Sequence, residues 1–129
     1  MKTSVNRKAL LLPLLLLATG SAWAGWEKVS TTAEDTAYVD RATIRKDGNL
    51  RKVWEITDLK QRDTTGAMSV RARFEYDCKD ERYMLLTLST HTEPMAGGTT
   101  IVSGKGSEKW QEIPPGTAAE HMLKIVCAQ

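Results

Sequence analysis

The chain has 129 residues, of which 41% are hydrophobic and 26% are charged, and its formal net charge at pH 7 is +2. Three of the 18 basic residues lie in positions 1–24, which hold no acidic residue, so 15 basic and 16 acidic residues remain in positions 25–129. A segment with this balance has no overall positive field that would attract nucleic acid or an anionic membrane. We therefore expect no nucleic-acid partner.

Positions 1–24 have the pattern of an export signal. Three basic residues precede an apolar run at 9–18, and small residues at 22 and 24 form the motif that precedes signal cleavage. The run is far shorter than the roughly 20 apolar residues of a spanning helix, so we expect no stable membrane insertion, with a retained N-terminal anchor as the alternative. We predict export through the inner membrane to the periplasm, the cell surface or the medium, with 1–24 cleaved and 25–129 forming one domain.

Short strands are predicted for the first part of the exported chain. Residues 25–30, 36–40 and 42–45 indicate extended pieces, and Asp47-Gly48 predicts a tight hairpin turn before a longer strand at 50–59. Alternation along 50–59 separates its side chains into two faces. One face holds Lys52, Trp54 and Ile56, and the other holds Arg51, Val53, Glu55 and Thr57.

The most regular alternation in the chain is at 67–78, which we predict to be a strand at the centre of a sheet. Its apolar face holds Met68, Val70, Ala72, Phe74, Tyr76 and Cys78, and its polar face holds Ser69, Arg71, Arg73, Glu75 and Asp77. Such a strand has one side on a hydrophobic core and one side toward water.

The charges of these two strands suggest how they pair. We expect Glu55 to lie opposite Arg71, and Arg51 opposite Glu75, on the water side of the sheet. The same register turns Trp54 toward the core. A shift by one residue would turn charged side chains toward the core, so this register is preferred.

The following segment, 82–91, is predicted as a strand that continues the core. Its apolar residues Met84, Leu86 and Leu88 are expected opposite Tyr76, Phe74 and Ala72. Pro94 and Gly97-Gly98 then interrupt the sheet before short strands at 100–103 and 110–113.

A single helix is predicted at the end of the chain. Thr117 and Glu120 match a capping box, in which both side chains satisfy free backbone amides of the first turn. The helix carries one apolar stripe, formed by Ala119, Met122, Leu123 and Val126. This stripe is expected to pack on the sheet.

Two cysteines, Cys78 and Cys127, lie in the exported part of the chain. In an exported protein such a pair usually forms a disulfide, and two buried free thiols are the alternative. A disulfide between them would stabilise the fold by about 4 kcal/mol, because it lowers the conformational entropy of the unfolded chain. The predicted fold class is therefore α+β, a twisted antiparallel sheet of about six strands with a C-terminal helix packed on it and tied by one disulfide.

An ordered set of motifs resembles the surface-adhesin protein E family of Gram-negative bacteria. The set consists of Trp26, Tyr38-Val39-Asp40, Val53-Trp54-Glu55-Ile56, Phe74-Glu75-Tyr76-Asp77-Cys78, Arg82, Pro115-Gly116-Thr117 and Val126-Cys127. The resemblance spans nearly all of 25–129 and implies a twisted antiparallel sheet with a helix tied to it by the cysteines. It also implies an adhesin that binds host matrix or plasma proteins.

Residues suited to catalysis or metal binding are few. His91, Glu93 and His121 would supply three zinc ligands only if the helix folded over the loop after 91, and His121 is expected to face solvent instead. A hydrolase based on His91 and Glu93 is the lowest-ranked alternative. We expect no enzyme, no metal site and no cofactor.

The charged face of the two central strands is the candidate binding face, formed by Arg51, Arg71, Arg73, Glu55 and Glu75. Its residues form either ordinary cross-strand ion pairs or a recognition surface for an acidic partner. We predict a non-catalytic exported binding module of the cell envelope, with protein partners in the host matrix or the envelope and with a homodimer left open. The alternative is a periplasmic small-ligand carrier with a cavity between sheet and helix.

Overall fold

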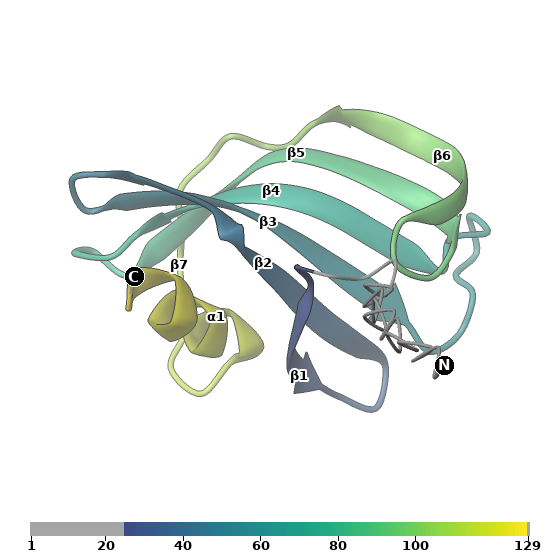
Figure 1. Ribbon diagram of the computed structural model, residues 1–129, viewed down its shortest axis with the longest axis horizontal. Coiled ribbons are helices and arrows are strands. Elements are labelled where there is room, and N and C mark those ends of the chain that lie inside the picture. Colours follow the sequence, from purple (N-terminus) through teal and green to yellow (C-terminus); the bar gives the residue numbers. More distant parts are fainter. Residues whose placement is uncertain (1–24, 129) are drawn as a thin grey trace, which may run out of the picture.

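The computed structural model describes residues 25–128, so the predicted signal segment and its cleavage site lie outside the described residues (Figure 1). The described part consists of a seven-stranded antiparallel sheet and one helix. The strands are β1 (Glu27–Thr31), β2 (Asp35–Asp47), β3 (Leu50–Leu59), β4 (Ser69–Asp77), β5 (Arg82–Glu93), β6 (Gly97–Lys105) and β7 (Gln111–Glu112), and the helix is α1 (Ala118–Cys127).

The first six strands are neighbours in the order of the chain, and every pair is antiparallel. The short β7 pairs with the first residues of β5, beyond the stretch that pairs with β6. Figure 1 shows the twisted sheet with β1 and β6 at its two edges and α1 against one face. This is the predicted fold class, with seven strands in place of about six.

Packing of α1 on the sheet forms the hydrophobic core. Val39, Val53 and Tyr76 of three adjacent strands are buried together with Met122, Leu123, Val126 and Ile113. The helix begins as predicted, because Thr117 Oγ1 accepts a hydrogen bond from the Glu120 amide at 3.2 Å. Such a cap contributes about 1 kcal/mol to helix stability.

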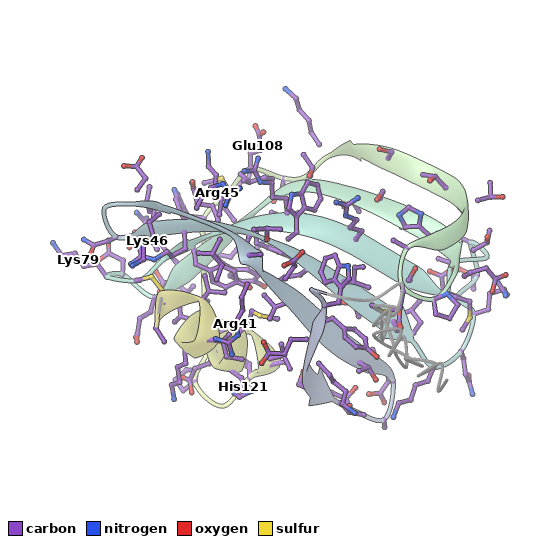
Figure 2. All side chains as sticks on the ribbon, viewed as in Figure 1. Arg41, Arg45, Lys46, Lys79, Glu108 and His121 are labelled. Carbon is purple, nitrogen blue, oxygen red and sulfur yellow. A yellow bond between two sulfur atoms is a disulfide. The ribbon has the colours of Figure 1, made fainter. Side chains whose placement is uncertain are left out.

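A disulfide joins Cys78, just after β4, to Cys127, the last residue of α1. Its sulfur–sulfur bond is visible at the left of Figure 2. The predicted pairing is therefore confirmed, and neither cysteine is free. The bond holds the C-terminal end of the helix against the sheet.

The register of β3 and β4 differs by one residue from the predicted one. Glu55 lies opposite Ala72, and Arg51 lies opposite Tyr76, so Arg51 and Glu55 point toward α1. Trp54 points to the other face. The prediction was wrong because β3 is buried on both faces: Val53 is 0% exposed on one side and Ile56 only 1% on the other. A strand of this kind gives no simple polar alternation.

A β-bulge changes the predicted core of β5. Phe74 pairs with Leu85, whereas the preceding Arg73 pairs with Thr87, which leaves Leu86 as an extra residue. Beyond the bulge, Tyr83 takes the place opposite Tyr76 that was predicted for Met84. A bulge reverses the alternation on one side of it, and that is why the prediction failed there.

Candidate functional site

The sheet face opposite α1 is the first candidate site, and we call it the open face. Residues paired across antiparallel strands point to the same side, so the register defines its members. They include Tyr38 and Asp40 of β2, Lys52, Trp54 and Ile56 of β3, Arg71, Arg73 and Glu75 of β4, and Thr87, Ser89 and His91 of β5. One end of this face is covered by the β5–β6 turn, where the Met95 amide donates to Asp58 Oδ1 at 2.7 Å.

A guanidinium stacked on an indole is the main feature of the open face. The Arg71 guanidinium carbon lies 4.3 Å from the centroid of the Trp54 ring. A contact of this kind contributes about 0.5–1 kcal/mol at an exposed site and holds both side chains in place. Arg71 is exposed and Trp54 is half-buried, so together they present a flat surface to solvent.

The charges of the open face are unevenly paired. Glu75 is close to Lys52, with 3.9 Å between Oε2 and Nζ. Within residues 25–128, neither Arg71 nor Arg73 forms an ion pair with a carboxylate. Positive charge is therefore left available beside the Trp54 ring.

A hollow of about 380 Å³ adjoins Trp54 on this face. Its other walls come from residues 87–89 of β5 and 103–105 of β6, which include Lys105. The hollow gives the open face depth and a further cation.

The predicted binding face is divided between the two sides of the sheet. Arg71, Arg73 and Glu75 share the open face, but Arg51 and Glu55 lie on the helix side. The predicted pairs of Glu55 with Arg71 and of Arg51 with Glu75 do not form. Arg51 instead donates through Nη1 to the Gly48 carbonyl at 2.7 Å and the Leu50 carbonyl at 3.0 Å, which braces the β2–β3 hairpin.

Glu55 lies beneath the start of α1, which sequence reasoning did not foresee. The Tyr76 hydroxyl donates to its Oε2 at 2.6 Å. Burial raises the pKa of this carboxyl from 4.5 to about 7, and the hydrogen bond from Tyr76 opposes part of that shift. Sequence reasoning would have placed Glu55 correctly only if it had recognised that Val53 and Ile56 are buried on opposite faces of β3.

The three residues considered as zinc ligands, His91, Glu93 and His121, are not brought together. His91 is buried on the open-face side, where its Nε2 is 2.8 Å from Ser89 Oγ, and burial followed by the Arg71 charge lowers its pKa. His121 is exposed on α1, across the sheet, with Nε2 at 3.2 Å from the Val29 carbonyl oxygen. In the described part of the chain, no three potential metal ligands lie together.

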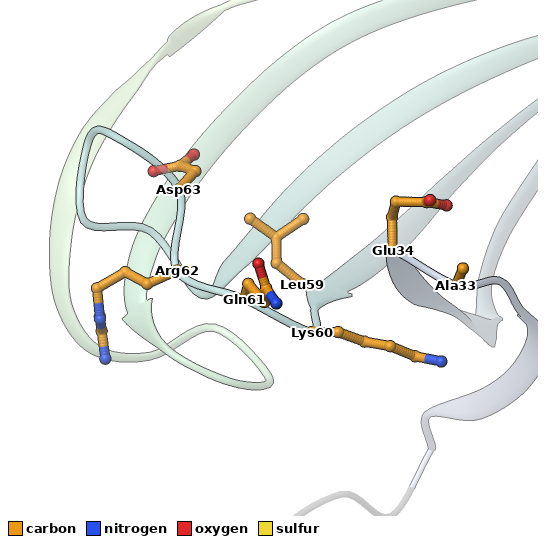
Figure 3. Close-up of a pocket in the computed structure, with 7 residues that line it drawn as sticks. All are labelled: Ala33, Glu34, Leu59, Lys60, Gln61, Arg62 and Asp63. Carbon is orange, nitrogen blue, oxygen red and sulfur yellow. The ribbon is translucent and has the colours of Figure 1, made fainter.

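A further hollow, of about 710 Å³, is formed by the β1–β2 turn and by the end of β3 with the loop that follows it (Figure 3). Ala33 and Glu34 line one side, and residues 59–63 line the rest. Arg62 has a structural role, because its Nη1 donates hydrogen bonds to the carbonyls of Gly66 at 2.8 Å and Thr92 at 2.6 Å and so joins the loop to β5. In Figure 3 the Lys60 and Arg62 side chains extend in different directions and do not converge on one point, so this hollow has no evident chemistry.

The described part of the chain contains no helix long and apolar enough to cross a membrane. Its fold is an antiparallel sheet with one C-terminal helix tied to it by a disulfide. Residues 26–128 match the surface-adhesin protein E family, and the chain belongs to this family. The resemblance inferred from the motifs is therefore confirmed.

Solved structures of protein E from Haemophilus influenzae have the same fold. Crystal form II aligns with a TM-score of 0.67 at 17% identity, covering 81% of this chain and 88% of that one. Protein E from a non-typeable strain aligns with a TM-score of 0.65 at 17% identity, covering 81% and 76%. Among curated proteins, none matches this chain.

Proposed function

We propose that this chain is an exported, non-catalytic binding module that attaches to an acidic protein surface through its open face. The single observation that carries the proposal is the pair Arg71 and Arg73, free of ion pairs in the described structure and adjoining the Trp54 ring. Arginine and tryptophan are the residue types that most often dominate binding energy at protein interfaces. A guanidinium also binds carboxylates through two parallel hydrogen bonds.

The family supports a place at the cell surface, and the pattern of positions 1–24 supports export with cleavage after Ala24. The partner is then a protein of the host matrix, of plasma or of the envelope, and protein E gives its name to an adhesin family. A small-ligand carrier ranks second. The cleft between sheet and helix has a volume of about 170 Å³, below the roughly 300–1,000 Å³ of pockets for drug-sized ligands.

Charge reversal on the open face tests the proposal. We expect Arg71→Glu/Arg73→Glu to weaken binding to immobilised matrix and plasma proteins at least about tenfold, because it places like charges against an acidic partner. The matched control is Lys46→Glu/Lys79→Glu, which changes the net charge equally at exposed residues at one end of the molecule (Figure 2). The measurement is surface plasmon resonance with each purified protein.

Equal losses in the two double variants would show that only net charge matters, and the proposal would be wrong. Sedimentation velocity of the same samples tests whether a second copy of the chain binds the open face, because a dimer would then be present in the wild type and lost in Arg71→Glu/Arg73→Glu. For the wild type we also expect weaker binding at higher salt, because screening reduces attraction between exposed charges.

A further inference from the structure

A cleft of about 170 Å³ lies between the sheet and the beginning of α1. Glu55 and the rings of Phe74, Tyr76 and Tyr83 line it from the sheet, and Ala119 and Met122 line it from the helix. The cleft is close in size to a cavity that holds one benzene molecule. It therefore suits a ligand of about five or six non-hydrogen atoms.

The polar lining of this cleft is negative. Glu55 and Asp35 are its carboxylates, and no cationic side chain lines it. The Tyr76 hydroxyl donates a hydrogen bond to Glu55 Oε2, whereas no group among the described residues donates to Oε1. One carboxylate oxygen is thus left for a donor that the described chain does not supply.

Three aromatic rings line the same cleft as Glu55 and lie next to one another. The Phe74 and Tyr83 centroids are 5.7 Å apart, and the Tyr76 and Tyr83 centroids are 6.0 Å apart. Cations are attracted to aromatic rings, and most strongly where water is excluded. The aromatic rings and the Glu55 carboxylate thus both favour a positively charged ligand.

We propose that this cleft binds a small primary alkylammonium ion, with Glu55 as its counter-ion and the three aromatic rings as its wall. The ammonium group donates to Oε1, and a short alkyl chain lies along the rings toward Ala119 and Met122. The inference is independent of partner binding on the open face, because the two sites lie on opposite sides of the sheet.

The ionisation of Glu55 makes the binding depend on pH. The other titratable groups in the cleft are Asp35 of β2, Tyr76 of β4 and Tyr83 of β5, and α1 contributes only Ala118, Ala119 and Met122. Since the pKa of Glu55 is about 7, its carboxylate is the minor form at pH 5.5 and the major form at pH 8.5. An alkylammonium ion stays charged across this range, so the apparent affinity should rise about 30-fold between these pH values.

The test is titration of the protein, purified from cells expressing the whole chain, with n-butylammonium chloride at pH 8.5. Amide NMR signals of Glu55, Tyr76 and Ala119 should shift and saturate, with a midpoint of about 1–10 mM. Sodium butyrate, an anion of similar size, and sodium chloride at equal ionic strength should leave these signals in place. The proposal would be wrong if n-butylammonium shifted only the amide signals of residues near carboxylates on the surface of the protein.

Glu55→Gln keeps the shape of the side chain and removes its charge, so n-butylammonium should bind it at least about tenfold more weakly. Glu75→Gln makes the same change on the open face and should leave binding as in the wild type. If Glu55→Gln fails to fold, the pH series on the wild type still decides. Equal affinity at pH 5.5 and 8.5, equal binding of butyrate, or unaltered binding by a folded Glu55→Gln would each rule the site out.

Discussion

Glu55 is a carboxyl group that the fold places next to its own hydrophobic core. Its pKa rises from 4.5 to about 7, chiefly through burial, so the folded protein holds a proton that the unfolded chain has lost between these pH values. The stability that comes from this protonation is complete below pH 4.5. It is lost as the pH rises through 7.

We therefore predict that the free energy of unfolding falls as the pH rises from 5 to 8, and that Glu55→Gln removes this part of the fall. The difference between the variant and the wild type should grow by about 2–3 kcal/mol across the range, since each pKa unit corresponds to 1.36 kcal/mol. Urea unfolding at several pH values measures it. Groups common to both proteins, including His91, cancel in the difference.

Glu75→Gln serves as the control, because Glu75 lies on the other face. Its unfolding free energy should follow that of the wild type at every pH. Parallel curves for wild type and Glu55→Gln would mean that Glu55 is ionised in the folded protein at all these pH values.

The bulge in β5 is held by the segment that follows β6. The Gly106 amide donates to the Leu86 carbonyl at 2.9 Å, and the Glu108 amide donates to the Leu85 carbonyl at 3.1 Å. A Cβ atom at position 106 would overlap the Leu85 carbonyl oxygen and Cγ. Only glycine allows this close approach of two backbones.

Gly106→Ala should accordingly destabilise the protein by about 1–3 kcal/mol, the usual range for a forced backbone shift. Gly104→Ala is the matched control, since its Cβ would meet nothing within 4 Å. We expect a change within about 0.5 kcal/mol for the control. Thermal and urea unfolding of the pair give the comparison, and similar losses in both variants would contradict the role assigned to Gly106.

At the level of the complete fold, the disulfide joins residues 49 positions apart and ties α1 to the sheet. Its removal frees a long loop in the unfolded chain, which corresponds to about 4 kcal/mol on the chain-entropy model. We predict that Cys78→Ser/Cys127→Ser lowers the unfolding free energy by about 2–5 kcal/mol. Chemical denaturation measures this, and thiol titration of the denatured, unreduced wild type should find no free thiol.

The sequence alone was sufficient for the meander of strands, the capped helix and the cysteine pair. These features depend on local patterns: alternation in 50–59 and 67–78, the Asp47-Gly48 turn, and the Thr117 cap. The strands, the turn and the cap are each set by residues close together in the chain, whereas the cysteine pair was inferred from the presence of two cysteines in a segment predicted to be exported. The family match over 26–128 agrees with these features. The alternation in 67–78 also predicted correctly which side chains of β4 share a face.

Which side of β3 meets the helix was decided by contacts between distant segments. A strand buried on both faces carries no polar side to mark its register. Glu55 is accommodated beside the core by its raised pKa and by the hydrogen bond from the Tyr76 hydroxyl. The bulge at Leu86 likewise depends on Gly106, twenty residues further along the chain. The stacking of Arg71 on Trp54 and the cleft around Glu55 follow from that register, because a shift of one residue exchanges the two faces of a strand.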